Sequence, residues 1–265
     1  MPSPVKNLFS DVQGAIDMID NGLVFDLGFH NGDDTDFYLA KGFRVLAVEA
    51  NPRLVQSGNE RFKREISADQ LRIIHGAVSA AVGLQKFYIH PEKSDWSSCL
   101  QERAESDGSS AEVILVDSIC LADLCSQFGV PRYVKVDVEG CDVMVAQQVS
   151  QLQEKPTYIS FETSKRDYAG LFAYLCVSGY DGYQLINQAN NATRGAPAGP
   201  GEGKTIDYQF SQYSSGYFGR DLPQDRWLSY DEALVRYIKY KELKQIDNQE
   251  LGLGWLDLHA RNGSS

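Results

Sequence analysis

The chain has 265 residues, 43% of them hydrophobic and 23% charged, and its formal net charge is −11. This length suits one large α/β domain, alone or with an appendage. The negative charge disfavours nucleic acid as a partner, because an acidic surface repels phosphate backbones. No apolar run approaches the roughly 20 residues of a membrane-spanning helix, and no basic start followed by an apolar run suggests a signal peptide. We therefore expect a cytoplasmic protein with no membrane partner.

Strands and helices are predicted to alternate through the first half of the chain. Short apolar runs are typical of buried strands, and the segments between them are typical of helices that end at glycine or start at proline. A cap over residues 1–21 is expected before one domain over 22–265. The strands expected in this half are Leu23–Leu27, Arg44–Val48, Leu71–His75, Val82–His90 and Val113–Val116, and the helices are Asp33–Lys41, Pro52–Ile66 and Asp117–Phe128.

The alternation continues in the second half and is then interrupted. Two polar stretches, 91–110 and 187–228, are predicted as insertions; within the second, Asn187–Lys204 is expected on the surface and Thr205–Phe218 to contain a strand. The alternation predicts an α/β fold with a mostly parallel sheet and helices on both faces. The further strands expected are Tyr133–Val136, Thr157–Phe161 and Tyr183–Ile186, and the helices are Val143–Val149, Tyr168–Ser178 and Ser229–Leu243.

The five cysteines are expected to be free thiols. Their number is odd and none forms a C-x-x-C pair, so neither a disulfide framework nor a zinc site is predicted. They are Cys99, Cys120, Cys125, Cys141 and Cys176.

The turn after the first strand is the first candidate for ligand binding, since ligands of such sheets sit beyond the carboxyl ends of the strands. Residues 23–32 read L-V-F-D-L-G-F-H-N-G. Glycine lets the backbone approach a ligand closely. Phe29 stands where the dinucleotide pattern G-x-G-x-x-G needs another glycine, so a pyrophosphate would fit poorly, whereas a small amino-acid tail would not. Any strand-to-helix turn can nevertheless contain glycine without binding a ligand.

The carboxylate of Glu49 is the second candidate. It follows the second strand in V-E-A-N-P. A carboxylate at this position can accept hydrogen bonds from both hydroxyls of a ribose. Taken alone, Glu49 fits a solvated loop residue equally well, but together with the first turn it indicates an adenosine ligand.

Asp137 and Glu139 are the third candidates. They stand two positions apart in K-V-D-V-E-G, directly after an apolar strand. Residues i and i+2 of a strand share a face, so both carboxylates could point into one pocket. Such a pair could work as acid and base, or hold a divalent cation with waters. Alternatively, one of them caps the next helix and the other is solvated.

Four further residues are weaker candidates. His30 lies inside the first turn and could contact the ligand. His75 could act as a general base, although a lone histidine is more often a structural hydrogen-bond partner. Glu162 follows the strand expected beside the Asp137 strand and could face the same pocket. Lys135 precedes the acidic pair.

The order of these motifs resembles that of the FkbM-type methyltransferases. The resemblance covers residues 22–165 well and the rest loosely. Its specific part is the combination of V-E-A-N-P with K-V-D-V-E-G. The motifs are V-F-D-L-G-F-H-N-G-D-D-T, A-V-E-A-N-P, H-G-A-V-S, V-D-S-I and Y-V-K-V-D-V-E-G-C-D, with S-G-Y-F-G-R-D-L at Ser215–Leu222 as a looser match.

The resemblance implies a class I, Rossmann-like methyltransferase with a seven-stranded sheet. It implies methyl transfer from S-adenosylmethionine, with S-adenosylhomocysteine as product, to a hydroxyl group of a sugar, polyketide or related small metabolite. His30 departs from the asparagine of many members. By position, the resemblance implies that the cofactor contacts are Asp26, Gly28, Gly32, Glu49, Ala77 and Val78, and that the acids facing the active site are Asp137 and Glu139. His30 is expected to contact the cofactor only because of its place in the first turn.

A hydroxyl acceptor has to lose its proton during the reaction. We expect Asp137 or Glu139, and with less support His75 or Glu162, to accept it. No metal ligand is assigned, and the need for a divalent cation is left open, as are the identity of the acceptor and the oligomeric state.

Two other functions are compatible with such a sheet. A nicotinamide-dependent oxidoreductase would need three close glycines, which are absent, and would bind NAD. A non-catalytic methyltransferase-fold module would bind a partner without turnover. The acids that follow the strand Tyr133–Val136 argue against such a module, and an activity assay distinguishes it from an active methyltransferase.

Overall fold

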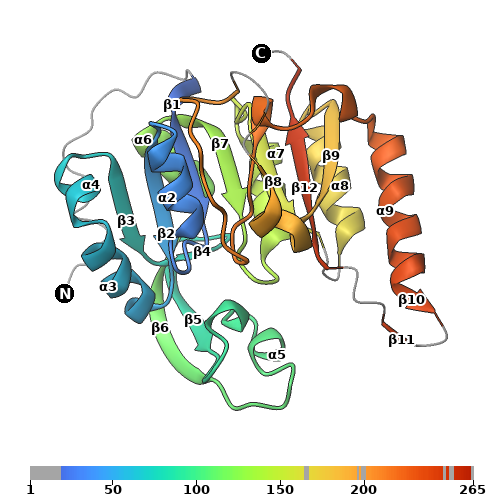
Figure 1. Ribbon diagram of the computed structural model, residues 1–265. Helices are drawn as coiled ribbons and strands as arrows, with labels where there is room; N and C mark the ends of the chain where they lie inside the picture. Colours follow the sequence, from blue (N-terminus) through green and yellow to red (C-terminus); the bar gives the residue numbers. More distant parts are fainter. Residues whose placement is uncertain are drawn as a thin grey trace.

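The computed structural model describes residues 19–163, 167–195, 197, 201–246, 249–250 and 254–263. Its central sheet has seven strands: β1 (Ile19–Leu27), β2 (Arg44–Glu49), β3 (Leu71–His75), β7 (Val130–Val136), β8 (Tyr158–Glu162), β9 (Gly182–Asn187) and β12 (Leu256–Arg261). They lie in the order β3-β2-β1-β7-β8-β12-β9 (Figure 1). In this sheet, β12 runs antiparallel to the other six strands. The predicted Rossmann-like, mostly parallel, seven-stranded sheet is confirmed.

The strand order reverses at the centre of this sheet, between β1 and β7. From β1 the chain runs outward through β2 to β3, and it then returns to β7 on the opposite side of β1. In open α/β sheets, this reversal opens a crevice at the carboxyl ends of the two central strands. The segments that follow β1 and β7 therefore meet where a ligand is expected.

The two faces of the sheet are covered differently. One face packs against α6 (Leu121–Phe128), α7 (Asp142–Gln151), α8 (Tyr168–Val177) and α9 (Tyr230–Lys244). The other packs against α2 (Asp33–Ala40), α3 (Pro52–Arg61) and α4 (Lys63–Ser67), and against an aromatic segment that is not helical. Among the described residues, no helix has the length and apolar character needed to cross a membrane.

This aromatic segment, residues 201–222, is called the covering segment below. The predicted strand in Thr205–Phe218 is wrong, because the segment packs its aromatic side chains onto the sheet instead of pairing with it. The ring of Phe218 stacks on Tyr133 with centroids 4.2 Å apart, and a buried ion pair of 2.7 Å joins Lys41 to Asp221. Two short 3-10 turns, η3 (Gly219–Asp221) and η4 (Gln224–Arg226), end this region.

The stretch Asn187–Lys204 lies on the surface only in part. It begins with a 3-10 helix, η2 (Gln188–Thr193), and the side chains of Asn191 and Glu202 are buried. Glu202 accepts hydrogen bonds from the guanidinium of Arg132, at 2.6 and 2.9 Å. The polar composition of this stretch therefore satisfies buried groups as well as solvent.

A second, smaller sheet extends from the end of the main one (Figure 1). Its strands are β4 (Ala77–Val78), β5 (Gly83–Ile89) and β6 (Glu112–Ile119), in the order β4-β6-β5. The expected extra strand over Val82–His90 is confirmed by β5. The predicted start of a helix at Asp117 is wrong, because Ser118 and Ile119 pair with β4 and extend β6.

Residues 91–110, predicted as a loop, contain η1 (Ser94–Trp96) and α5 (Gln101–Ala104). The buried ring of His90 organises the start of this segment. Its Nδ1 accepts hydrogen bonds from the backbone N–H groups of Glu92 and Lys93, at 3.1 and 2.9 Å.

The strand β12 has no counterpart among the predicted elements. A short hairpin of β10 (Gln245–Ile246) and β11 (Gln249–Glu250) precedes it. The sequence L-D-L-H-A-R alternates apolar and polar residues, and Leu256, Leu258 and Ala260 join the helix-covered core. At the other end, residues 1–18 of the expected cap lie outside the described residues. Its last three positions, 19–21, belong to β1, which begins at Ile19.

Leu258→Ala tests whether the C-terminal strand is part of the sheet interior. The side chain of Leu258 is fully buried, so its truncation is expected to lower the free energy of unfolding by about 2–5 kcal/mol. Leu115→Ala is the matched control, because Leu115 lies in β6 with 63% of its side chain exposed; a change within about 0.5 kcal/mol is expected there. Equal losses in urea denaturation of the two variants would contradict the assignment.

Candidate functional site

A cavity of about 730 Å³ lies at the carboxyl ends of the central strands. It is lined by the turn after β1, the end of β2, the segment that leads into β4, the loop after β7 and the end of β8. Of the predicted site residues, those that line it are Gly28, His30, Glu49, Ala77, Val78, Lys135, Asp137, Glu139 and Glu162. The sheet thus brings together residues that are far apart in the sequence.

The buried ammonium group of Lys135 connects three of these segments. Its Nζ lies 3.5 Å from Asp26, 3.3 Å from Asp34 and 3.7 Å from Asp137, and it donates a 3.1 Å hydrogen bond to the carbonyl oxygen of Gly28. Burial opposes the charge of Lys135, but the surrounding carboxylates raise its pKa well above the usual value. Lys135 is therefore a fixed cation in the lining of the cavity.

Asp26 supports the cavity from below and does not line it. Its side chain is fully buried and accepts a 2.7 Å hydrogen bond from the hydroxyl of Thr35. Burial raises the pKa of Asp26 to about 6, against the attraction of Lys135. The expected cofactor contact of Asp26 stays a prediction, and the structure gives this residue a positioning role.

Gly28 and Gly32 each have a steric reason to be glycine. Gly28 has a φ of 93°, and a Cβ there would meet the carbonyl oxygen of Asp137 at 1.9 Å. At Gly32, which does not line the cavity, φ is 81° and a Cβ would meet the rings of Phe29 and Phe62 at 2.6 Å. The turn is thus shaped by contacts within the protein, and Gly28 lets the loop after β7 approach it.

The carboxylate of Glu49 lies at the end of β2 and faces the cavity. Its two oxygens accept backbone hydrogen bonds from His30 and Asn51, at 2.8 and 2.7 Å. Burial raises the pKa of Glu49 to about 7, although both hydrogen bonds act in the opposite direction. A carboxylate oxygen has more than one lone pair, so each oxygen retains acceptor capacity toward the cavity.

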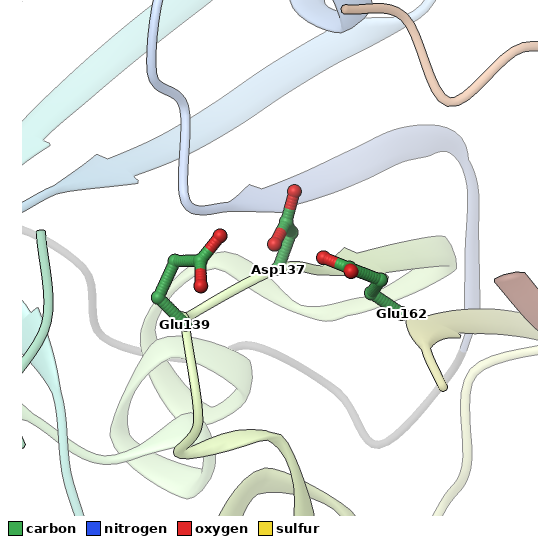
Figure 2. Close-up of side chains that lie close together, drawn as sticks. All are labelled: Asp137, Glu139 and Glu162. Carbon is green, nitrogen blue, oxygen red and sulfur yellow. The ribbon is translucent and has the colours of Figure 1, made fainter. Parts of the chain in front are cut away.

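Three carboxylates converge at the ends of β7 and β8. One oxygen from each of Asp137, Glu139 and Glu162 lies within 4.8 Å of the others, and all three side chains are half-buried. Figure 2 shows the carboxylates of Asp137 and Glu162 close together, with that of Glu139 on the other side of Asp137. Oxygen-rich groups of this kind could hold a divalent cation or the hydroxyl groups of a ligand.

Glu139 forms a close ion pair with Arg103, whereas Asp137 lies 3.7 Å from the ammonium of Lys135. Arg103 of α5 contacts Oε2 of Glu139 through Nε at 3.0 Å and through a terminal nitrogen at 2.9 Å. The φ of Glu139 is 47°, a left-handed conformation that is rare outside glycine. The segment containing η1 and α5 thereby holds the loop after β7.

His30 and His75 have different surroundings. His30 also has a positive φ, of 50°, and its Nε2 lies 2.8 Å from the hydroxyl of Ser94. Burial, followed by the charge of Lys135, lowers the pKa of His30, which favours the neutral ring. The ring of His75 lies outside the cavity lining, where its Nε2 is 3.2 Å from the carbonyl oxygen of Ala50. A role for His75 as general base stays a prediction.

Sequence reasoning missed the buried acid Asp257 of β12. It lines the cavity, pairs in register with Glu162, and bonds to the side-chain amide of Gln188. Burial, and then the neighbouring Glu162 and Asp137, raise the pKa of Asp257 well above its usual value. The apolar–polar alternation of its strand was the available signal. Other missed lining residues are Asp34, Trp96, Arg103 and Gln188.

Comparison with known proteins adds a family match. A family model described as "Methyltransferase FkbM domain" matches residues 26–182, more than half of the chain. No curated protein matches the sequence. Among solved structures, precorrin-6Y C5,15-methyltransferase from Geobacter metallireducens GS-15 is 12% identical with a TM-score of 0.34, over 72% of this chain and 76% of that chain. Geranyl diphosphate C-methyltransferase from Streptomyces coelicolor A3(2) is 8% identical with a TM-score of 0.38, over 91% and 73%.

Lys135→Met tests whether the buried ammonium stabilises the fold around the cavity. Removal of the cation leaves Asp26 and Asp34 without their shared counter-ion, and such losses cost about 3–5 kcal/mol. We expect a decrease of that size in the free energy of unfolding at neutral pH, measured by urea denaturation. Lys86→Met, at an exposed position of β5, controls for the loss of a lysine.

A second variant separates charge from packing. Adding Asp26→Asn to Lys135→Met removes one of the stranded carboxylates, so part of the lost stability should return. A loss below about 1 kcal/mol in the single variant would show that the ion cluster does not stabilise the fold.

Proposed function

The chain belongs to the methyltransferase FkbM domain family, and on that premise we propose that it transfers a methyl group from S-adenosylmethionine to a hydroxyl group of a small metabolite such as a sugar or polyketide. The observation that carries the proposal is the convergence of Asp137, Glu139 and Glu162 in one cavity with Glu49 and the turn after β1. The cofactor side and the acid side of this cavity would then face one reacting centre.

The residues that line the cavity fit the parts of the cofactor. Glu49 would accept the ribose hydroxyls with the lone pairs that its backbone hydrogen bonds leave available. Ala77 and Val78, both buried and apolar, would flank the adenine ring. Gly28 and His30 would contact the amino-acid end. The cofactor, when bound, supplies an electrophilic methyl group on a positively charged sulfur, which an acidic cavity accommodates.

Asp137 is the residue we assign as general base. Its carboxylate lies 3.7 Å from the Lys135 ammonium, which fixes its position, and its neighbours Glu139 and Glu162 border the same space. Glu139 is held by Arg103, so it is better suited to orient the acceptor than to take its proton. Alignment of the hydroxyl with the methyl group in a dry site provides much of such a rate enhancement.

The charge of the cavity supports an uncharged acceptor. Two cationic side chains line it, Arg103 and Lys135, and both are engaged with carboxylates. A phosphorylated or carboxylated acceptor would meet net repulsion, whereas sugar or polyketide hydroxyls can donate hydrogen bonds to the acids. The lining acids are Asp34, Glu49, Asp95, Asp137, Glu139, Glu162 and Asp257.

The affinity for S-adenosylhomocysteine should fall as the pH drops through about 7. The pKa of Glu49 is about 7 in the free protein, and the ribose hydroxyls bind the ionised carboxylate better. The dissociation constant is therefore constant above that pH and rises by up to about tenfold per pH unit below it. Isothermal titration calorimetry between pH 5.5 and 8.5 measures this dependence.

Glu49→Gln is the matched variant for that titration. It should bind S-adenosylhomocysteine more weakly and without the pH dependence, while Glu102→Gln, at an exposed position of α5, should behave as wild type. NAD, titrated in parallel, should not bind. A wild-type affinity that does not change with pH, or unchanged binding by Glu49→Gln, would remove Glu49 from the cofactor site.

Asp137→Asn should lower methyl transfer by about a hundredfold or more, the usual contribution of a general base. Transfer of labelled methyl from S-adenosylmethionine to a panel of neutral sugars and polyketides gives the rate, and S-adenosylhomocysteine binding controls for the intact site. Glu139→Gln should have a smaller effect, and Asp123→Asn, at an exposed position of α6, none. Unchanged rates in both Asp137→Asn and Glu139→Gln would refute the roles assigned to these two residues.

A further inference from the structure

Two of the five cysteines meet at the edge of the cavity. Cys99 precedes α5 and lines the cavity, whereas Cys141 follows Gly140 and is the N-cap residue of α7. Both thiols are free and partly exposed, and each is close enough to shift the pKa of the other. Two neighbouring thiols, one of them reachable from an open cavity, are the arrangement from which a disulfide forms.

The backbones around the two thiols are already held together. The hydroxyl of Ser98 donates a 2.6 Å hydrogen bond to the carbonyl oxygen of Glu139. The side chain of Leu100 packs on Gly140, with Cδ1 3.2 Å from where a Cβ would lie, and Arg103 forms its ion pair with Glu139. Because these contacts hold the two backbone segments side by side, a bond between Cys99 and Cys141 would join segments that already touch.

We propose that Cys99 and Cys141 form a reversible disulfide, which would link the segment containing η1 and α5 covalently to the loop that bears Asp137 and Glu139. Closure joins the two sulfur atoms by a bond of about 2.05 Å. The bond would fix these two segments, both of which line the cavity, to each other. The proposal concerns this pair of residues whatever reaction the cavity supports.

The chemistry is thiol–disulfide exchange with a small organic disulfide as oxidant. The thiolate of Cys99 attacks the disulfide, forms a mixed disulfide and releases one thiolate. The thiolate of Cys141 then attacks the Cys99 sulfur and releases the second. The two cysteine protons end on the two released thiols, so two protein thiols are oxidised and one small disulfide is reduced to two thiols.

The order of the two attacks follows from access to the cavity. Cys99 is the member of the pair that lines it. The neighbouring Cys141 thiol also lowers the pKa of Cys99, whereas Cys99 raises that of Cys141. A small, uncharged oxidant such as 2-hydroxyethyl disulfide suits this route, because the acidic lining repels anionic disulfides.

The other cysteines provide internal controls. Cys125 is buried in the helix-covered core, where burial raises its pKa to about 12, and it should not react. Cys176 is exposed on α8 and should form only a mixed disulfide. The expected product is therefore specific to one pair.

The test treats the full chain with 2-hydroxyethyl disulfide and maps the peptides by mass spectrometry without reduction. We expect one internal cross-link, Cys99 to Cys141, which excess dithiothreitol reverses. Cys141→Ser should stop at a mixed disulfide on Cys99, Cys99→Ser should give no cross-link, and Cys176→Ser should retain it. Circular dichroism checks that each variant is folded. For a variant that is not folded, wild-type protein with alkylated thiols serves as the control, because an alkylated thiol cannot form the cross-link.

Two results would overturn the proposal. One is a mixed disulfide that persists on Cys99 of the wild-type protein with no cross-link to Cys141. The other is a cross-link that joins either cysteine to a different residue at comparable yield.

Repeating the oxidation with S-adenosylhomocysteine present tests this proposal separately from the proposed function. Because Cys99 lines the same cavity as Ala77 and Val78, S-adenosylhomocysteine bound in the proposed position should slow the oxidation of Cys99. Cross-linking without such protection supports the disulfide and counts against the position of the cofactor. Protection without a cross-link supports the cofactor position and refutes the disulfide.

Discussion

The buried ammonium of Lys135 is the interaction on which the arrangement of the cavity depends. A charge out of water is tolerated only where opposite charges and hydrogen bonds compensate for its lost hydration. Here the compensation comes from β1, from the first turn of α2 and from the loop after β7. These three segments can compensate the charge only when they are brought together. The ammonium of Lys135 therefore fixes the geometry of both the turn after β1 and the loop after β7.

The close approach at Gly28 is the steric counterpart of this electrostatic constraint. The carbonyl oxygen of Asp137 occupies the space of a missing Cβ, so the turn after β1 and the loop after β7 pack backbone to backbone. Glu49 is attached to the same turn through the amide of His30. The carboxylates of Asp137 and Glu49, which belong to opposite sides of the strand-order reversal, therefore have their separation set by main-chain contacts and by short side chains.

The sequence was informative where local pattern determines structure. The apolar run and glycines that follow Leu23 predicted the strand, turn and helix correctly, and Glu49, Ala77 and Asp137 indeed line one cavity. Asp26 could not be placed from its sequence position, because only its partner Lys135, far away in the chain, shows that it points beneath the cavity. The roles of the lining residues remain those we propose.

The segments that sequence reasoning misread are held by distant partners. The aromatic residues of the covering segment resemble a strand, yet Phe218 stacks on Tyr133 of a remote strand. Asp117 and Ser118 resemble the start of a helix, but pairing with β4 and β5 extends the strand. Asp257 was overlooked because its strand is short and pairs only with β8 and β9, many residues earlier. Such non-local pairing leaves little trace in a local window.

The position of β12 between β8 and β9 has a consequence for the order in which the protein is completed during synthesis. Both neighbouring strands leave the ribosome well before β12, and until it arrives each presents an open edge that invites pairing with another chain. β12 closes both edges in one step and brings Asp257 into the lining of the cavity. A nascent chain arrested before Leu256 would thus lack a complete sheet and a complete site together, and this interval is when chaperone protection would matter most.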